Sequence, residues 1–210
     1  MTKGRQDTGR LLEQIRNGFS EPDYDRELAG HILSGLSVTG KRITVRPLAL
    51  SDYEVFVRGY KDCLPSRNRF DEGRFDTGFM TLKWYEELLE RRRREAVTDD
   101  CYMFHVFCNE DKRPLGYCDI TPHRRESFQY ARIGYTIFNN FWGKGYATEC
   151  VECLIKLGFA FLNLHRLEAH VNLDNPASKR VLEKAGFAFE CVRKGFILED
   201  GVWTDNEIYY

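Results

Sequence analysis

Apolar residues recur along this chain with two periods, and the order of the two predicts a mixed α/β fold. Runs with strand-like patterns predict strands over about 43–48, 101–109, 114–121, 129–138, 188–198 and 202–210. Helical spacing predicts helices over about 52–60, 81–94 and 146–162, the first capped by Ser51 and Asp52. The apolar stripe of the last helix is formed by Ala147, Val151, Leu154, Ile155, Phe159 and Leu162. The turn Glu199-Asp200-Gly201 joins the final two strands as a hairpin.

Two segments fall outside this alternation. Residues 1–40 are predicted as an N-terminal extension: a short amphipathic helix over about 8–19, followed by an arm that is rich in glycine. The rest of the chain, residues 41–210, is predicted as one domain. Within it, residues 61–78 combine charges, glycines and aromatic residues, which suits a loop that covers substrate.

Composition narrows the class of protein. The chain has 210 residues, 42% of them hydrophobic, and a formal net charge of −1, so no global basic field attracts nucleic acid or an anionic membrane. The basic run Arg91–Arg94 is interpreted as a solvated helix end rather than a phosphate contact. The segment 1–20 has no apolar run of signal-sequence length and no stretch approaches a membrane span, so we expect a soluble, cytoplasmic protein.

Cysteine usage indicates no metal or redox site. The seven cysteines are scattered among apolar positions, which is typical of reduced, buried thiols. Cys150 and Cys153 are spaced like a ligand pair, but no second pair has matching spacing.

A glycine-paired turn stands between the strand that ends near Phe138 and the helix that begins near Tyr146. Its residues are Phe141-Trp142-Gly143-Lys144-Gly145-Tyr146-Ala147-Thr148-Glu149. A glycine turn that opens a helix presents free N–H groups and the positive end of the helix dipole, which together attract phosphate. Lys144 lies between the glycines, which excludes a nucleoside-triphosphate P-loop, and Thr148 replaces the third glycine of a dinucleotide-binding motif.

These residues resemble the acyl-CoA loop of the GNAT N-acetyltransferases, R/Q-x-x-G-x-G/A, here occupied by Trp142 to Ala147. Trp142 departs from the usual Arg or Gln, as in the branch that resembles the ribosomal-protein N-terminal acetyltransferases. About thirty residues later, the segment from Arg166 to Phe187 resembles the second signature of the same family. It reads as a strand that ends in Asn175-Pro176-Ala177-Ser178, followed by a short helix that closes with Gly186-Phe187. The resemblance covers about residues 41–210 and implies the GNAT fold, a mixed, strongly twisted sheet of about seven strands with helices on both faces.

The resemblance also implies the chemistry. Relatives transfer an acetyl group from acetyl-CoA to an amine by direct attack in a ternary complex, without a metal. The strand edge would pair with the pantetheine arm, the loop would bind the pyrophosphate, and an asparagine would bind the pantetheine amide in addition to capping its helix. The cofactor-binding residues predicted in this way are Ile137, Phe138, Trp142, Gly143, Lys144, Gly145, Tyr146, Ala147, Thr148 and Asn175.

The leaving thiolate and the amine proton each need a partner. Leu182 stands where many relatives carry a tyrosine acid, so Ser178 is the remaining hydroxyl. Glu168, His170 and Asn172 alternate along one strand and share a face, and His170 or Glu168 is the predicted base, with a satisfied structural role as the open alternative for either. Asp119 and Tyr135 are outside candidates. Ile197 occupies the position where some relatives carry a glutamate on the penultimate strand.

The absence of an unmistakable base favours an acceptor that loses its proton easily. Neutralising a protein α-amine at pH 7 costs about 1 kcal/mol, against about 4.6 kcal/mol for a lysine side chain. A protein N-terminus is therefore the predicted acceptor, as the family resemblance also suggests. A small-molecule amine, another acyl group and a non-catalytic acyl-CoA sensor remain alternatives. The chain is expected to act as a monomer or homodimer.

Overall fold

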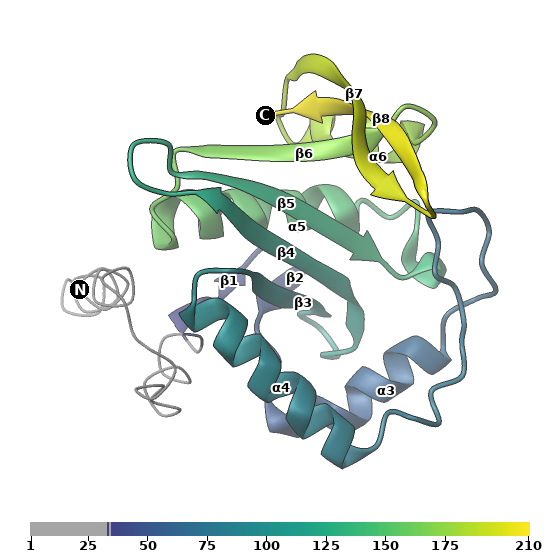
Figure 1. Ribbon diagram of the computed structural model, residues 1–210. Coiled ribbons are helices and arrows are strands. Elements are labelled where there is room, and N and C mark those ends of the chain that lie inside the picture. Colours follow the sequence, from purple (N-terminus) through teal and green to yellow (C-terminus); the bar gives the residue numbers. More distant parts are fainter. Residues whose placement is uncertain (1–32, 34) are drawn as a thin grey trace.

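A single mixed sheet organises the chain (Figure 1). The computed structural model describes residue 33 and residues 35–210, so the predicted helix over 8–19 lies outside the described residues. The strands are β1 (Val38–Thr39), β2 (Ile43–Arg46), β3 (Tyr102–Cys108), β4 (Pro114–Arg124), β5 (Tyr130–Ile137), β6 (Arg166–Asn172), β7 (Phe189–Glu199) and β8 (Val202–Tyr209). Their order across the sheet is β1-β2-β3-β4-β5-β6-β8-β7. The described part thus has eight strands where about seven were predicted.

All neighbouring strands pair antiparallel except β5 and β6. That parallel pairing spans only Tyr130–Arg132 of β5 and Arg166–Glu168 of β6. Beyond it, β5 continues beside β4 and β6 continues beside β8. The two central strands therefore separate toward their carboxyl ends, as Figure 1 shows. We call this separation the opening between β5 and β6.

Helices cover both faces of the sheet, as predicted. They are α3 (Tyr53–Lys61), α4 (Leu82–Val97), α5 (Tyr146–Lys156) and α6 (Pro176–Lys184). On one face, Val151 and Leu154 of α5 are buried in a cluster that includes Ile133 of β5. On the other face, α3 and α4 form a second cluster around Phe56 and Tyr85. Because successive side chains of a strand point to opposite faces, the same strands can pack against both layers of helices.

Two helix boundaries differ from the sequence pattern. The helix predicted to reach residue 162 is α-helical to Lys156 and continues as a π-helical turn over Leu157–Phe161. The first helix begins with a 3₁₀ turn over Leu50–Asp52, and the Asp52 side chain does not cap α3. Its carboxylate accepts two hydrogen bonds from Arg46, at 2.6 and 2.8 Å, because that guanidinium supplies charged donors in a bidentate geometry.

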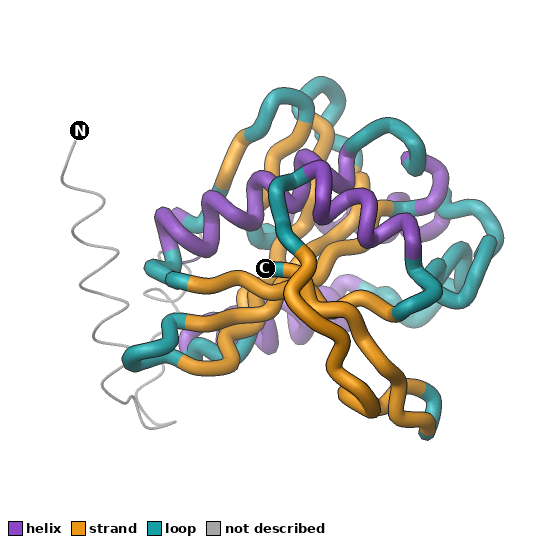
Figure 2. The backbone as a smooth tube through the Cα atoms, turned by 90° about the horizontal axis from the view of Figure 1, so that it is seen from above, coloured by secondary structure: helices purple, strands orange, loops and turns teal. Residues whose placement is uncertain are grey.

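The predicted C-terminal hairpin is confirmed. Asp200 and Gly201, the two residues between β7 and β8, both have positive φ, at 51° and 81°. Two such residues form the turn whose twist matches paired antiparallel strands. The hairpin projects from the sheet on the side away from α5 (Figure 2). Across the described ranges, no helix has the length and apolar character needed to cross a membrane.

Candidate active site

The opening between β5 and β6 is bounded by the end of β5. The N–H of Phe138 donates to the carbonyl of Leu115 on β4 at 2.8 Å, so it is occupied. Successive backbone groups of a strand point to opposite edges, which directs the N–H and C=O of Ile137 toward β6. The carbonyl of Ile137 accepts a hydrogen bond from the indole of Trp142 at 2.6 Å. Of the two predicted strand-end residues, Ile137 thus offers its N–H to the opening and Phe138 does not.

The glycine turn has the backbone that the sequence predicts. Gly143 and Gly145 have φ of 78° and 81°, a region that side chains with a Cβ rarely adopt, and Gly145 is the N-cap of α5. No heavy atom lies within 4 Å of the position that a Cβ on Gly143 would take. The turn is therefore an open cradle in front of the first N–H groups of α5. This arrangement fits the pyrophosphate of a CoA molecule.

Arg42, just before β2, braces this turn. Its backbone N–H and its Nε donate to the carboxylate of Glu149 in the first turn of α5, at 2.6 and 2.9 Å. A second guanidinium nitrogen donates to the carbonyl of Lys144 at 2.8 Å, and the guanidinium lies 4.7 Å from the ring centre of Tyr146. Without this partner, the buried charge of Glu149 would oppose an anion at the helix N-terminus. Arg42 was not identified from the sequence, because it lies 107 residues from Glu149.

Trp142 has a structural reason to depart from Arg or Gln. Its indole N–H ties the turn to the end of β5, as described above, and 38% of the residue remains exposed. The guanidinium of Arg67, from the loop after α3, lies 5.6 Å from the centre of the indole ring. Trp142 therefore links the glycine turn both to the strand edge and to the α3–α4 loop.

The start of α6 forms the other wall. Asn175 is the N-cap, and its side-chain oxygen accepts from the N–H of Ser178 at 3.2 Å, with Pro176 at the first helical position. This capping was predicted from the sequence. Leu182 is completely buried and faces the core rather than the opening. The hydroxyl of Ser178 lies 2.8 Å from that of Tyr135 on β5.

Glu168 and His170 lie together, as the alternation of β6 predicts, but within an ion-pair network. His170 Nε2 lies 3.2 Å from Glu168 Oε2. Glu168 also binds Arg166 at 2.7 Å and the hydroxyl of Tyr130 at 2.8 Å, and the guanidinium of Arg193 lies 3.3 Å away. Although burial opposes it, hydrogen bonds from Arg166, Tyr130 and His170 hold the pKa of Glu168 below its ordinary value. Burial lowers the pKa of His170.

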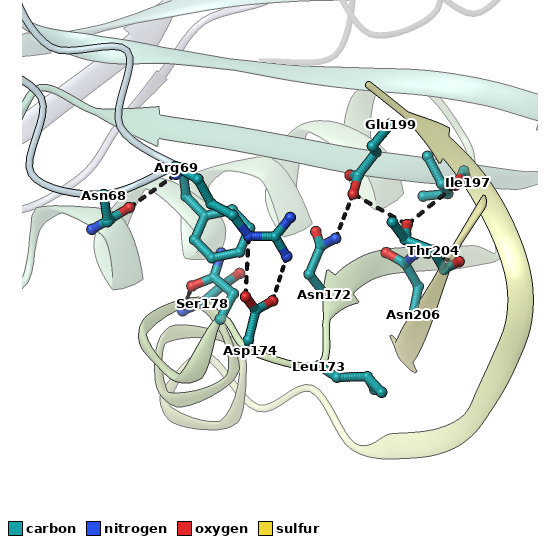
Figure 3. Close-up of polar contacts among 12 residues, drawn as sticks. Asn68, Arg69, Asn172, Leu173, Asp174, Ser178, Ile197, Glu199, Thr204 and Asn206 are labelled. Carbon is teal, nitrogen blue, oxygen red and sulfur yellow. Dashed lines mark hydrogen bonds and ion pairs between the residues drawn. The ribbon is translucent and has the colours of Figure 1, made fainter. Parts of the chain in front are cut away.

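A second carboxylate on the same face was missed. Asn172 donates its side-chain amide to Glu199 Oε2 at 2.6 Å, and the hydroxyl of Thr204 lies 3.1 Å from the same oxygen and 3.1 Å from the carbonyl oxygen of Ile197. Thr204 also accepts from the amide nitrogen of Asn206, whose buried Oδ1 has no hydrogen-bond partner within the described part of the chain. Figure 3 shows the Asn172 amide directed at Glu199. The sequence marked residues 199–201 only as a turn, and a glutamate two positions after Ile197 was the available signal.

The loop between α3 and α4 reaches the same opening. Arg69 binds Asp174, one residue before the α6 cap, with two nitrogen–oxygen contacts of 3.0 and 2.5 Å (Figure 3). The base of the loop is held by the buried Asn139, whose side chain accepts from the N–H of Leu64 and donates to its carbonyl. The predicted covering loop is thus tied to both walls of the opening.

The remaining charged and sulfur-containing motifs lie elsewhere. Arginines 92–94 of α4 make ion pairs within the helix, to Glu90 and Glu95. Cys150 and Cys153 are buried in the core of α5. Over the part of the chain that the structure describes, no group of three His, Cys, Asp or Glu side chains is arranged to hold a metal ion.

Comparison with known proteins agrees with this geometry. Residues 42–188 match the model of the acetyltransferase (GNAT) domain. A protein named Probable N-acetyltransferase YjcK, from Bacillus subtilis, is 32% identical over 169 residues, covering 80% of this chain and 93% of its own. The [ribosomal protein uS5]-alanine N-acetyltransferase of Escherichia coli is 29% identical over 105 residues, which are 50% of this chain and 54% of that protein. The solved structure of ribosomal-protein-S5-alanine acetyltransferase from Vibrio fischeri has a TM-score of 0.64 at 22% identity and covers 82% of this chain and 94% of its own.

Proposed function

This chain belongs to the acetyltransferase (GNAT) family, and from that premise we propose that it transfers an acetyl group from acetyl-CoA to the α-amine of a protein N-terminus. The observation that carries the proposal is the set of elements that meet where β5 and β6 separate. The end of β5, the glycine turn before α5 and the capped start of α6 surround this opening, and Glu199 lies on its acceptor side.

The residues at hand would hold the cofactor at three places. The N–H groups from Gly143 to Thr148 would bind the pyrophosphate, and the amide of Asn175 would bind the pantetheine arm. Bound acetyl-CoA supplies the acetyl group as a thioester, whose thiol is the leaving group. The N–H of Ile137, directed into the opening, would donate to the thioester carbonyl and stabilise negative charge there.

Glu199 suits the role of base better than the two residues that the sequence suggested. Glu168 is surrounded by Arg166, Arg193 and the hydroxyl of Tyr130, so an ammonium group would have to displace these donors. Glu199 has neutral donors only, both on Oε2, and it forms no ion pair within the described residues. Oε1 of Glu199 would then accept a hydrogen bond from the amine.

The proposal of an α-amine as acceptor follows from the free energy that is needed to remove a proton from the amine. One carboxylate in a partly polar site has to remove a proton that costs about 1 kcal/mol for an α-amine, against about 4.6 kcal/mol for a lysine side chain. The similarity to an enzyme named for alanine acetylation of a ribosomal protein supports the same class of acceptor.

The test is thiol release from acetyl-CoA by the full chain, with three acceptors: a peptide with a free α-amine and no lysine, an Nα-blocked lysine peptide, and spermidine. We expect release with the first peptide and none with Gly145→Asp, which places a carboxylate in the cradle. Release only with spermidine would replace the peptide acceptor by a small amine. Acetyl-CoA binding without release would instead support a sensor, and no binding would overturn both.

A further inference from the structure

The hydroxyl groups of Tyr135 and Ser178 meet at the start of α6. Tyr135 lies on β5, two residues before Ile137, and its oxygen is 2.8 Å from Ser178 Oγ. The same phenolic oxygen is 3.2 Å from the backbone carbonyl of Ser178. Ser178 in turn is fixed through its N–H to the cap oxygen of Asn175. Asn175 therefore fixes the backbone of Ser178, and Tyr135 contacts its side chain.

A phenol has one proton, so the direction of this contact decides what Ser178 can do. If Tyr135 donates to the backbone carbonyl, the hydroxyl of Ser178 must donate its own proton to the phenolic oxygen. If Tyr135 donates to Ser178 Oγ, the serine proton is free for another acceptor. The carbonyl of Ser178 lies in the first turn of α6, where helical geometry provides the N–H four residues later. Because that carbonyl already has a helical donor, we infer that the phenol donates its proton to Ser178 Oγ, the closer of the two oxygens at 2.8 Å.

We propose that Tyr135 is a positioning residue that turns the hydroxyl of Ser178 outward as the hydrogen-bond donor to the leaving thiolate. The inference rests on the proposed acetyl transfer. Leu182 stands where many relatives carry a tyrosine acid and cannot donate a proton. In this chain the phenol of Tyr135 comes from β5 instead and acts through Ser178.

The neutral amine nitrogen forms a bond to the thioester carbonyl carbon, and the carbon–sulfur bond breaks with its electron pair on sulfur. The Ser178 hydroxyl donates a hydrogen bond to that sulfur, while the amine proton leaves through the base. Burial raises the pKa of Tyr135 well above its ordinary value, so the phenol keeps its proton and orients Ser178 without relaying charge. The thiolate takes its final proton from solvent.

The first test is a double-mutant cycle with Tyr135→Phe and Ser178→Ala. Tyr135→Phe keeps the buried ring and should lower kcat about tenfold while the KM for acetyl-CoA stays within about twofold. Ser178→Ala should lower kcat by 10- to 100-fold as an order of magnitude, and the double variant should fall no further than Ser178→Ala. Tyr130→Phe removes a phenol from the other face of β5 and serves as the matched control. Losses that multiply in the double variant would overturn the inference.

The second test does not depend on turnover. It compares the affinities of CoA and desulfo-CoA for the full chain by calorimetry between pH 7 and pH 9.5. A donor at the sulfur favours the thiolate, so CoA should gain affinity over desulfo-CoA as pH rises, and Tyr135→Phe and Ser178→Ala should both abolish the gain. An unchanged gain in Tyr135→Phe would overturn the role of Tyr135 alone. Failure of both ligands to bind the wild-type chain would overturn the proposed function and this inference with it.

Discussion

Arg42 neutralises Glu149 beside the turn proposed to bind the pyrophosphate, through its backbone N–H and its Nε, across 107 residues of chain. The carboxylate is buried in the first turn of α5, whereas 45% of the Arg42 side chain is exposed. The pair therefore joins the edge of the sheet to the phosphate-facing end of α5. Its consequences should appear both in stability and in cofactor binding.

Arg42→Gln should lower the free energy of unfolding by about 1–2 kcal/mol, since Glu149 keeps only its backbone donor and the exposed half of the pair is screened by water. The Kd for acetyl-CoA should rise about tenfold, because the anion would face an uncompensated carboxylate. Urea unfolding and calorimetry measure the two effects. Lys41→Gln, an adjacent exposed position, removes the same charge and should change neither quantity appreciably; an equal effect of Lys41→Gln would show that only the overall field matters.

Gly143→Ala should weaken acetyl-CoA binding without a local clash in the protein. The new Cβ has open space, and positive φ costs about 1 kcal/mol of stability. Gly186→Ala is a matched control, because Gly186 also has positive φ and open space but follows α6 at its C-terminus. Both variants should lose similar stability in thermal unfolding, and only Gly143→Ala should raise the Kd, by at least about tenfold. Equal Kd values for the two variants would contradict the cradle.

Glu199→Gln should act on turnover, and Glu168→Gln on stability. The first change keeps an oxygen for Asn172 and Thr204 but removes the base, so kcat/KM should fall by 10²–10⁴-fold as an order of magnitude. The second leaves Arg166 and Arg193 beside a neutral group and should lower the free energy of unfolding by about 2–3 kcal/mol. Steady-state kinetics and urea unfolding on both variants provide the comparison. If Glu168→Gln lost turnover while keeping full stability, and Glu199→Gln stayed active, the role of base would belong to Glu168 on β6.

His105 should make the fold sensitive to mild acid. Burial, reinforced by Arg92, lowers the pKa of His105 from 6.5 to about 3, and neither ring nitrogen has a hydrogen-bond partner among the described residues. Below pH 6.5 the unfolded chain binds a proton that the folded chain does not, so stability falls as pH falls. Between pH 7 and pH 5 this group contributes a loss of roughly 2 kcal/mol.

The measurement is urea unfolding at pH 7 and pH 5 for the wild type and for His105→Leu, which has similar volume and does not titrate. The pH-dependent loss should be smaller by roughly 2 kcal/mol in the variant. His165→Gln, at an exposed position, controls for the removal of a histidine. An identical loss in wild type and His105→Leu would show that other groups cause the acid sensitivity.

Features carried by neighbouring residues could be predicted from the sequence. The positive φ of Gly143 and Gly145, the cap at Asn175 and the hairpin turn at Asp200 and Gly201 all follow from short-range backbone sterics and hydrogen bonding. The shared face of Glu168 and His170 follows from the alternation of one strand. In each case the partners lie within a few positions of one another.

The environment of each side chain could not be predicted in this way. Glu168 and Glu199 are both glutamates on strands, yet one meets two arginines and the other meets an amide and a hydroxyl. The partners of Glu199 come from β6 and β8, and their approach depends on how strands from different parts of the chain are ordered in the sheet. Tyr135 reaches Ser178 across 43 residues for the same reason.

The sequence by itself therefore determined the family, the glycine turn before α5 and the capped start of α6, because contiguous residues encode backbone geometry. Only the tertiary structure decided which carboxylate meets neutral donors and which meets arginines, which hydroxyl faces Ser178 and which arginine neutralises Glu149. Charge compensation is a property of distance in space, and residues 43 and 107 positions apart become neighbours only when the sheet is assembled.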